Sequence, residues 1–125
     1  MASNKTFRFG PVAMSNTLTT NILNPNVTSL AGPVGFTMTQ PYIILRHIRI
    51  VNKTAGAVTF SLWLGATGGN AAGTEVVGIG LSVAANSAYD WYGMLRLDAA
   101  DFLVGGASAA TSLSIQGEGE IGVSG

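Results

Sequence analysis

The chain lacks cysteine and has few charged residues, and each absence narrows what it can be. With no cysteine among its 125 residues, it can form neither a disulfide nor a thiolate metal site. Charged residues make up 10% of the chain, against about 25% in an average soluble domain. The six basic and six acidic residues cancel to a formal net charge of zero. Because the cations form no cluster, the sequence predicts no nucleic-acid partner.

Long apolar runs are missing too. No window approaches the roughly 18 consecutive apolar residues of a membrane span, and the N-terminal residues contain no apolar stretch of the signal-peptide kind. We therefore expect synthesis in a cytoplasm and no membrane partner. The mean hydropathy is nevertheless +0.40. A surface this poor in charge predicts that other protein chains cover part of it, because permanent interfaces are more hydrophobic than transient ones.

What the chain does show is alternation of apolar and polar residues. Between Tyr42 and Val123, short alternating runs are separated by turns rich in Gly, Asn, Ala and Ser. A period of two is typical of half-buried strands, and no segment keeps a helical period. About seven to nine strands at this spacing indicate an all-β fold, a single antiparallel β-sandwich that is jelly-roll-like.

The chain divides into two regions by regularity. Residues 36–125 are predicted to form the β-sandwich domain. Residues 1–35 are less regular, because Pro11, Pro25 and Pro33 interrupt them and proline lacks the donor that a central strand needs. This first region is predicted to form an N-terminal arm, edge strands of the sandwich, or both.

The strongest strand signal is the run Tyr42–Val51. Its alternation is imperfect, because strict alternation places Arg46 on one face with Ile48 and places His47 on the other face with Leu45. This pattern indicates either a β-bulge within the strand or partial burial of both faces. A short loop of turn-forming residues joins it to the next run, Ala57–Leu64. The two runs are therefore predicted to form an antiparallel hairpin.

The predicted core consists of the apolar residues that share one face of these runs. They are Ile48, Ile50, Val58, Phe60, Leu62, Ile79, Leu81, Trp91, Leu95, Leu113 and Ile115. The run Val77–Val83 alternates with glycines, so it is predicted to be a strand that a neighbouring backbone can approach closely. Residues 105–109 are predicted to form a loop, because they are small and rich in glycine.

Few residues suggest catalysis. His47 is the only histidine and lies mid-strand between Arg46 and Arg49. A catalytic histidine needs an orienting carboxylate and a nucleophile within reach, and nearby cations favour its neutral form. We interpret His47 as a residue of a sheet face or an interface, and predict no catalytic residue and no enzyme.

Two pairs of acidic residues suggest metal or glycosidase chemistry only weakly. Glu118 and Glu120 share one face of a strand, roughly 7 Å apart, a spacing that suits a calcium site or a glycosidase pair. Like-charged pairs are also common on solvated strand faces. Asp98 and Asp101 flank a turn, where aspartate accepts backbone hydrogen bonds. We predict no metal and no cofactor.

Four aromatic residues could form a platform for a sugar or a base: Tyr89, Trp91, Tyr92 and Trp63. Trp91 shares its face with the core residue Leu95, so it is predicted to be buried. Exposed aromatics mark protein interfaces at least as often as ligand sites. Trp63 and Tyr92 are therefore interface candidates.

The layout of the chain from Tyr42 onward resembles that of small structural proteins from the virions of tailed bacteriophages. The resembling stretches are HIRIVNKTAGAVTFSLWL, LSVAANSAYDW, LRLDAADFLV and LSIQGEGEIGV. The resemblance implies a β-sandwich or jelly-roll subunit of a capsid or tail, with no enzymatic residues to carry over. It does not extend to residues 1–40.

These observations lead to one functional expectation and two rivals. We expect a non-enzymatic structural subunit of a phage particle, a decoration or cement protein that stabilises the capsid shell and resides in the virion. The rivals are a neck or tail component and a carbohydrate-binding module. The expected partners are the major capsid protein or other virion proteins.

Self-association is also expected, with a trimer as the favoured homo-oligomer. Phe7, Phe9, Val12 and Met14 show no regular strand phase, so they are predicted to contact a neighbouring subunit or the shell. The glycine-rich face of Val77–Val83 would let a neighbour approach closely.

Overall fold

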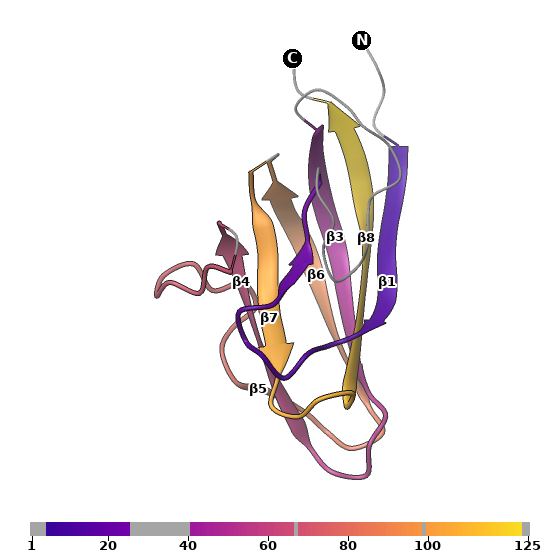
Figure 1. Cartoon of the computed structure of the whole chain (residues 1–125). Helices are drawn as coiled ribbons and strands as arrows, with labels where there is room; N and C mark the ends of the chain where they lie inside the picture. The colour runs from indigo at the N-terminus through magenta and orange to yellow at the C-terminus, as the bar shows by residue number, and fades with distance from the viewer. Residues whose placement is uncertain (1–4, 26–40, 67, 99, 124–125) are drawn as a thin grey trace.

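The protein is an all-β sandwich. The computed structural model describes residues 5–25, 41–66, 68–98 and 100–123, and among them it contains eight strands and no helix. The strands form two four-stranded sheets that face each other (Figure 1). The predicted fold class, an antiparallel β-sandwich, is confirmed. In this part of the chain no helix is long and apolar enough to cross a membrane.

All strand pairs are antiparallel. The first sheet has the order β1-β8-β3-β6 and the second has the order β2-β7-β4-β5. The strands of the first sheet are β1 (Lys5–Ala13), β8 (Leu113–Val123), β3 (Pro41–Asn52) and β6 (Ala88–Leu97). Those of the second are β2 (Asn21–Leu23), β7 (Phe102–Ala107), β4 (Val58–Gly65) and β5 (Leu81–Val83).

A β-bulge at Arg46 explains the phase change in β3. The register of β3 shifts between Leu45 and His47 against both of its neighbours. Leu45 is fully buried before the shift and Ile48 is buried after it, so one extra residue returns the apolar side chains to the core. Of the two interpretations of this run, the bulge is therefore the correct one. Arg46 is an extra residue of β3 against β8, whereas against β6 it faces the two residues Gly93 and Met94.

The predicted hairpin between the third and fourth strands is wrong, because β3 and β4 belong to different sheets. The buried side chain of Asn52 organises the connection between them. Its Nδ2 donates to the carbonyl oxygens of Gly56 at 2.8 Å and Val83 at 3.0 Å, and its Oδ1 accepts from the backbone N of Thr54 at 2.9 Å. These hydrogen bonds hold the loop as it passes from one sheet to the other.

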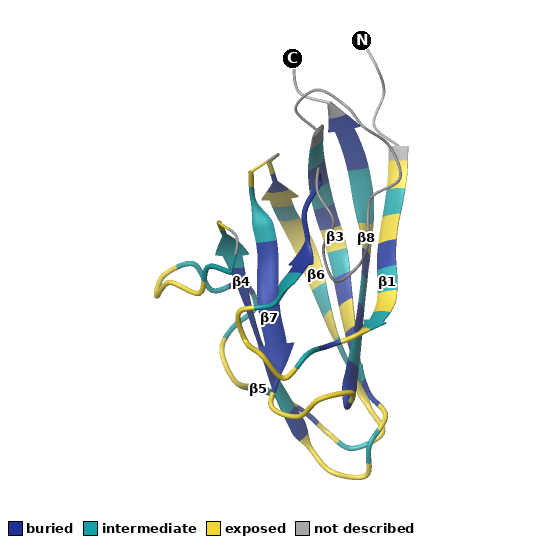
Figure 2. Cartoon of the chain, viewed as in Figure 1, coloured by how far each residue is buried: buried dark blue, intermediate teal, exposed yellow. Residues whose placement is uncertain are grey.

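Most of the predicted core is buried. Phe60, Leu62 and the predicted residues of β3 and β8 lie in the core, while Leu81, Trp91 and Leu95 pack against it partly buried. Figure 2 shows that β7 is buried along most of its length.

The prediction that Ile79 lies in the core is wrong, because this residue is 59% exposed. Val77 has a φ of 71° and Gly80 a φ of 62°, values outside the strand region. The segment therefore departs from regular strand geometry, although it keeps single backbone contacts with β4, and only Leu81–Val83 pairs with β4 as a strand.

The predicted loop at 105–109 is also corrected, since β7 continues through Gly105 and Gly106 to Ala107. A Cβ atom on Gly105 would overlap the carbonyl oxygen of Ser61, and one on Gly106 would lie 2.6 Å from the carbonyl oxygen of Thr17. Glycine occurs here because other main chain approaches the strand closely.

The N-terminal region supplies an edge strand to each sheet within the residues described. β1 pairs with β8 and β2 pairs with β7. Phe9 and Met14 are 4% and 1% exposed and belong to the core. The view that these side chains have no place in their own sandwich is therefore wrong. Residues 26–35 of the expected arm lie outside the described residues.

Candidate functional site

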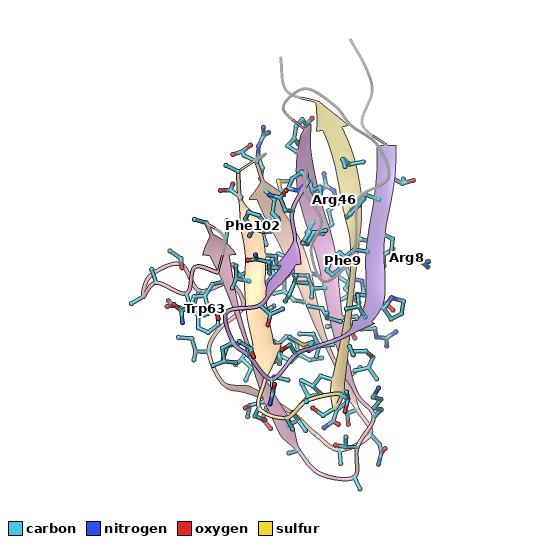
Figure 3. The ribbon with its side chains drawn as sticks, viewed as in Figure 1. Arg8, Phe9, Arg46, Trp63 and Phe102 are labelled. Carbon is cyan, nitrogen blue, oxygen red and sulfur yellow. The ribbon has the colours of Figure 1, made fainter. Side chains whose placement is uncertain are left out.

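More than half of the charged residues lie on the outer face of the β1-β8-β3-β6 sheet. They are Arg8, Arg46, Arg49, Asp90, Arg96, Glu118 and Glu120. The strand registers place Arg8, Glu118, His47 and Tyr92 in one row across all four strands. Figure 3 shows Arg8 and Phe9 on opposite sides of β1, one outward and one toward the core.

His47 connects the three strands β8, β3 and β6. Its Nε2 lies 2.8 Å from Asp90 Oδ1 and its Nδ1 lies 3.1 Å from Glu118 Oε1. Its ring stacks on that of Tyr92, with centroids 4.6 Å apart and planes 9° from parallel. An ionised carboxylate only accepts hydrogen bonds, so both contacts form only when both ring nitrogens carry a proton.

The carboxylates raise the pKa of His47. The hydrogen bond to Asp90 contributes most, burial opposes it, and the bond to Glu118 raises the pKa further. The expectation that Arg46 and Arg49 favour the neutral ring is therefore wrong. Arg49 Nε lies 3.3 Å from Asp90 Oδ1, so its charge is offset by the carboxylate that also binds His47.

This geometry gives a pH-dependent stability. Because the folded state raises the pKa of His47, its contribution should be complete below the unfolded value of about 6.5 and be lost as the pH rises through the folded value. We expect a loss of about 0.5–1 kcal/mol, because Asp90 and Glu118 are partly exposed. Urea unfolding from pH 6 to 9 measures it. A His47→Gln variant should lack this slope, and equal slopes would contradict the prediction.

The arrangement around His47 binds the ring rather than freeing it for proton transfer. While both contacts persist, neither ring nitrogen is available as a general base. The two carboxylates contact opposite nitrogens of the ring. A metal ion bound to one of these nitrogens would therefore be in reach of only one of the two carboxylates. Among the residues that the structure describes, no group of three or more His, Asp or Glu side chains could hold a metal.

The other acidic residues fill separate roles. Glu120 Oε2 accepts from Arg46 Nε at 2.7 Å, whereas Glu118 binds His47, so each carboxylate has its own partner. Asp98 and Asp101 close a turn as predicted, since the backbone N of Asp98 donates to Asp101 Oδ2 at 2.9 Å.

The interface candidates separate into buried and exposed residues. Tyr92 is 73% exposed on the outer face, and Trp63 is 4% exposed. Phe9 and Met14 are buried in the core, and Phe7 packs against it partly buried. Val12 is half-buried. The protein itself therefore covers Phe9, Met14 and Trp63.

Trp63 is covered by the chain between β4 and β5, beside which Figure 3 places it. It forms an isolated bridge with Glu75, and the following residue, Val76, donates its backbone N–H to the carbonyl oxygen of Leu62 at 2.9 Å. The indole Nε1 of Trp63 is buried and has no hydrogen-bond partner among the described residues. Sequence could not reveal this cover, because the covering segment is not a regular strand.

Sequence reasoning missed two residues of the outer face. Asp90 is the main partner of His47, and only the register between β3 and β6 brings them together. Met94 is 66% exposed. The sequence did contain a sign of this exposure, because Met94 alternates in phase with Tyr92 on the polar side of the same strand.

No protein-family model matches the chain, and no curated protein is significantly similar to it. The likeness to phage virion proteins therefore depends on the sequence pattern alone.

Proposed function

We propose that the protein is a non-enzymatic structural subunit of a bacteriophage particle, a decoration or cement protein of the capsid. The strand order carries this proposal. Eight antiparallel strands in the orders β1-β8-β3-β6 and β2-β7-β4-β5 fit a jelly roll, an architecture of viral capsid domains and of lectins. The resemblance of the sequence pattern from Tyr42 onward points to the viral use.

The surface chemistry supports protein–protein contacts. Charges on the outer face neutralise one another within the chain, as in the pairs Arg46–Glu120 and Arg49–Asp90. Tyr92 remains prominently exposed beside them. Exposed aromatics and arginines are enriched at interfaces. Other virion proteins and further copies of the chain are the proposed partners.

Analysis of purified particles tests the proposal. The protein should co-purify with virions in a fixed ratio to the major capsid protein, and a particle reconstruction should place its density on the capsid surface. Shells assembled without it should open at a lower temperature and regain resistance when the purified protein is added. Density at the neck or tail would favour that rival, and absence from purified particles would refute all virion roles.

A carbohydrate-binding module is the second candidate, because one observation favours it. The ring of Tyr92 is 73% exposed and stacks on His47 beside two carboxylates. An exposed aromatic ring with polar neighbours can stack against a sugar. A glycan array should then give signals that Tyr92→Ala abolishes and Arg8→Ala leaves intact. A silent array would favour the structural role.

A further inference from the structure

The strand β6 forms one edge of its sheet. It pairs with β3 on one side, and no described residue pairs with its other side. β6 is ten residues long, and a long edge strand offers a row of backbone donors and acceptors to another chain. Tyr92 and Met94, at its centre, are 73% and 66% exposed. Over residues 88–96, this edge therefore has no backbone partner among the described residues, and it carries two exposed apolar side chains.

The sequence of β6 is complementary to itself when it is reversed about Gly93. Residues directly opposite in an antiparallel pair lie on the same face of the sheet. With a two-fold axis at Gly93, Asp90 lies opposite Arg96 of the second copy, and Tyr92 lies opposite Met94 of the second copy. On the core-facing side, Trp91 then lies opposite Leu95, and both are partly buried in the single copy. Opposite charges and sulfur–aromatic contacts both favour such pairs.

The neighbouring registers lack this complementarity. Moving the axis to Tyr92 places Asp90 opposite Met94, and moving it to Met94 places Asp90 opposite Asp98. Only the axis at Gly93 gives two Asp–Arg pairs by symmetry.

The charged side chains are already held in position on the outer face. Asp90 binds His47 at 2.8 Å and Arg49 at 3.3 Å. Arg96 binds Asp98 at 2.7 Å, and its guanidinium lies 4.2 Å from the ring centroid of Tyr42. Side chains that are ordered before association lose less entropy on binding.

We propose that two copies of this chain pair through β6 about a two-fold axis at Gly93, which joins their sheets into one continuous eight-stranded sheet. The occupant of the free edge is thus a second copy. This proposal does not depend on the virion role, because it concerns the purified protein alone.

Sedimentation equilibrium of the purified full chain tests the pairing. The wild type should form a reversible dimer between micromolar and near-millimolar concentration. Asp90→Arg and Arg96→Asp each place like charges opposite each other twice, and each should weaken the dimer roughly tenfold to hundredfold. Mixing the two variants should restore the dimer. In the mixed dimer the two substituted side chains, of opposite charge, face each other, and the unsubstituted Arg96 of one copy faces the unsubstituted Asp90 of the other.

Two further variants keep the test informative if a charge reversal disturbs the fold. Met94→Lys changes an exposed side chain at the centre of the edge and should weaken the dimer by a similar factor. Arg8→Asp reverses an exposed charge on β1, the opposite edge of the same sheet, and should leave the dimer unchanged. A monomer at all concentrations overturns the proposal. So does an oligomer whose mass Met94→Lys and the two charge reversals leave unchanged.

Discussion

Leu62→Ala should lower the free energy of unfolding by about 2–5 kcal/mol. Leu62 is fully buried and lies on β4, an inner strand between β7 and β5. Truncation removes the apolar contacts and leaves a cavity that fixed strands on both sides cannot close. Against a total stability of about 5–15 kcal/mol, this loss would remove a large share of the stability. Guanidinium unfolding followed by tryptophan fluorescence, at one fixed protein concentration, measures it.

Ile79→Ala is the matched control, because it also shortens an aliphatic side chain that alternation had placed in the core. Ile79 is 59% exposed, so its truncation should change the free energy of unfolding by less than about 0.5 kcal/mol. Equal losses at Leu62 and Ile79 would mean that residues 77–80 pair with β4 as a regular strand, against the structure.

Much of the fold could be predicted because alternation reports directly which side chains face the core. The imperfect alternation of Tyr42–Val51 indicated a bulge as one of two interpretations, and the structure places that bulge between Leu45 and His47. The opposed faces of β8 were likewise predicted, with Leu113 inward and Glu118 outward.

The partners of each strand could not be predicted, because a period of two identifies faces and carries no information on neighbours. β3 and β4 follow each other in sequence with a short loop, as in a hairpin, yet they belong to different sheets and the buried side chain of Asn52 holds the loop between them. The contacts of the candidate site could not be predicted for the same reason. His47 was recognised in the sequence, but its partners Asp90 and Glu118 lie on two other strands that are far from it in sequence.

Glycine was the second source of error, since composition does not distinguish a loop from a crowded strand. Gly105 and Gly106 lie in β7, where nearby main chain leaves no room for a side chain. Gly78 and Gly80 resembled strand residues, yet their positive φ values take the chain out of regular strand geometry. Glycine thus occurs both in a crowded strand and in an irregular segment, and the two cases differ in how closely other main chain approaches.

Gly119→Ala tests the crowded kind of glycine at the bulge itself. Gly119 pairs with Leu45 immediately before the register of β3 shifts. A Cβ atom at this position would overlap the carbonyl oxygen of Ile44 and lie 3.0 Å from the Cα of Leu45. Because both obstacles are main-chain atoms of an inner strand, no rotamer change can relieve them. We expect a loss at or above the upper end of the range of about 1–3 kcal/mol for overpacked sites.

Gly56→Ala separates this clash from the general effect of replacing glycine. A Cβ atom at Gly56 would have no heavy atom within 4 Å, and no left-handed φ is required there. The substitution should therefore be neutral or stabilise the fold by up to about 1 kcal/mol, because alanine restricts the unfolded chain. If Gly119→Ala proves as mild as Gly56→Ala in the same unfolding experiment, β3 and β8 do not approach as closely as the bulge at Arg46 requires. The reversal of side-chain phase that places His47 on the outer face and Ile48 in the core would then need another cause.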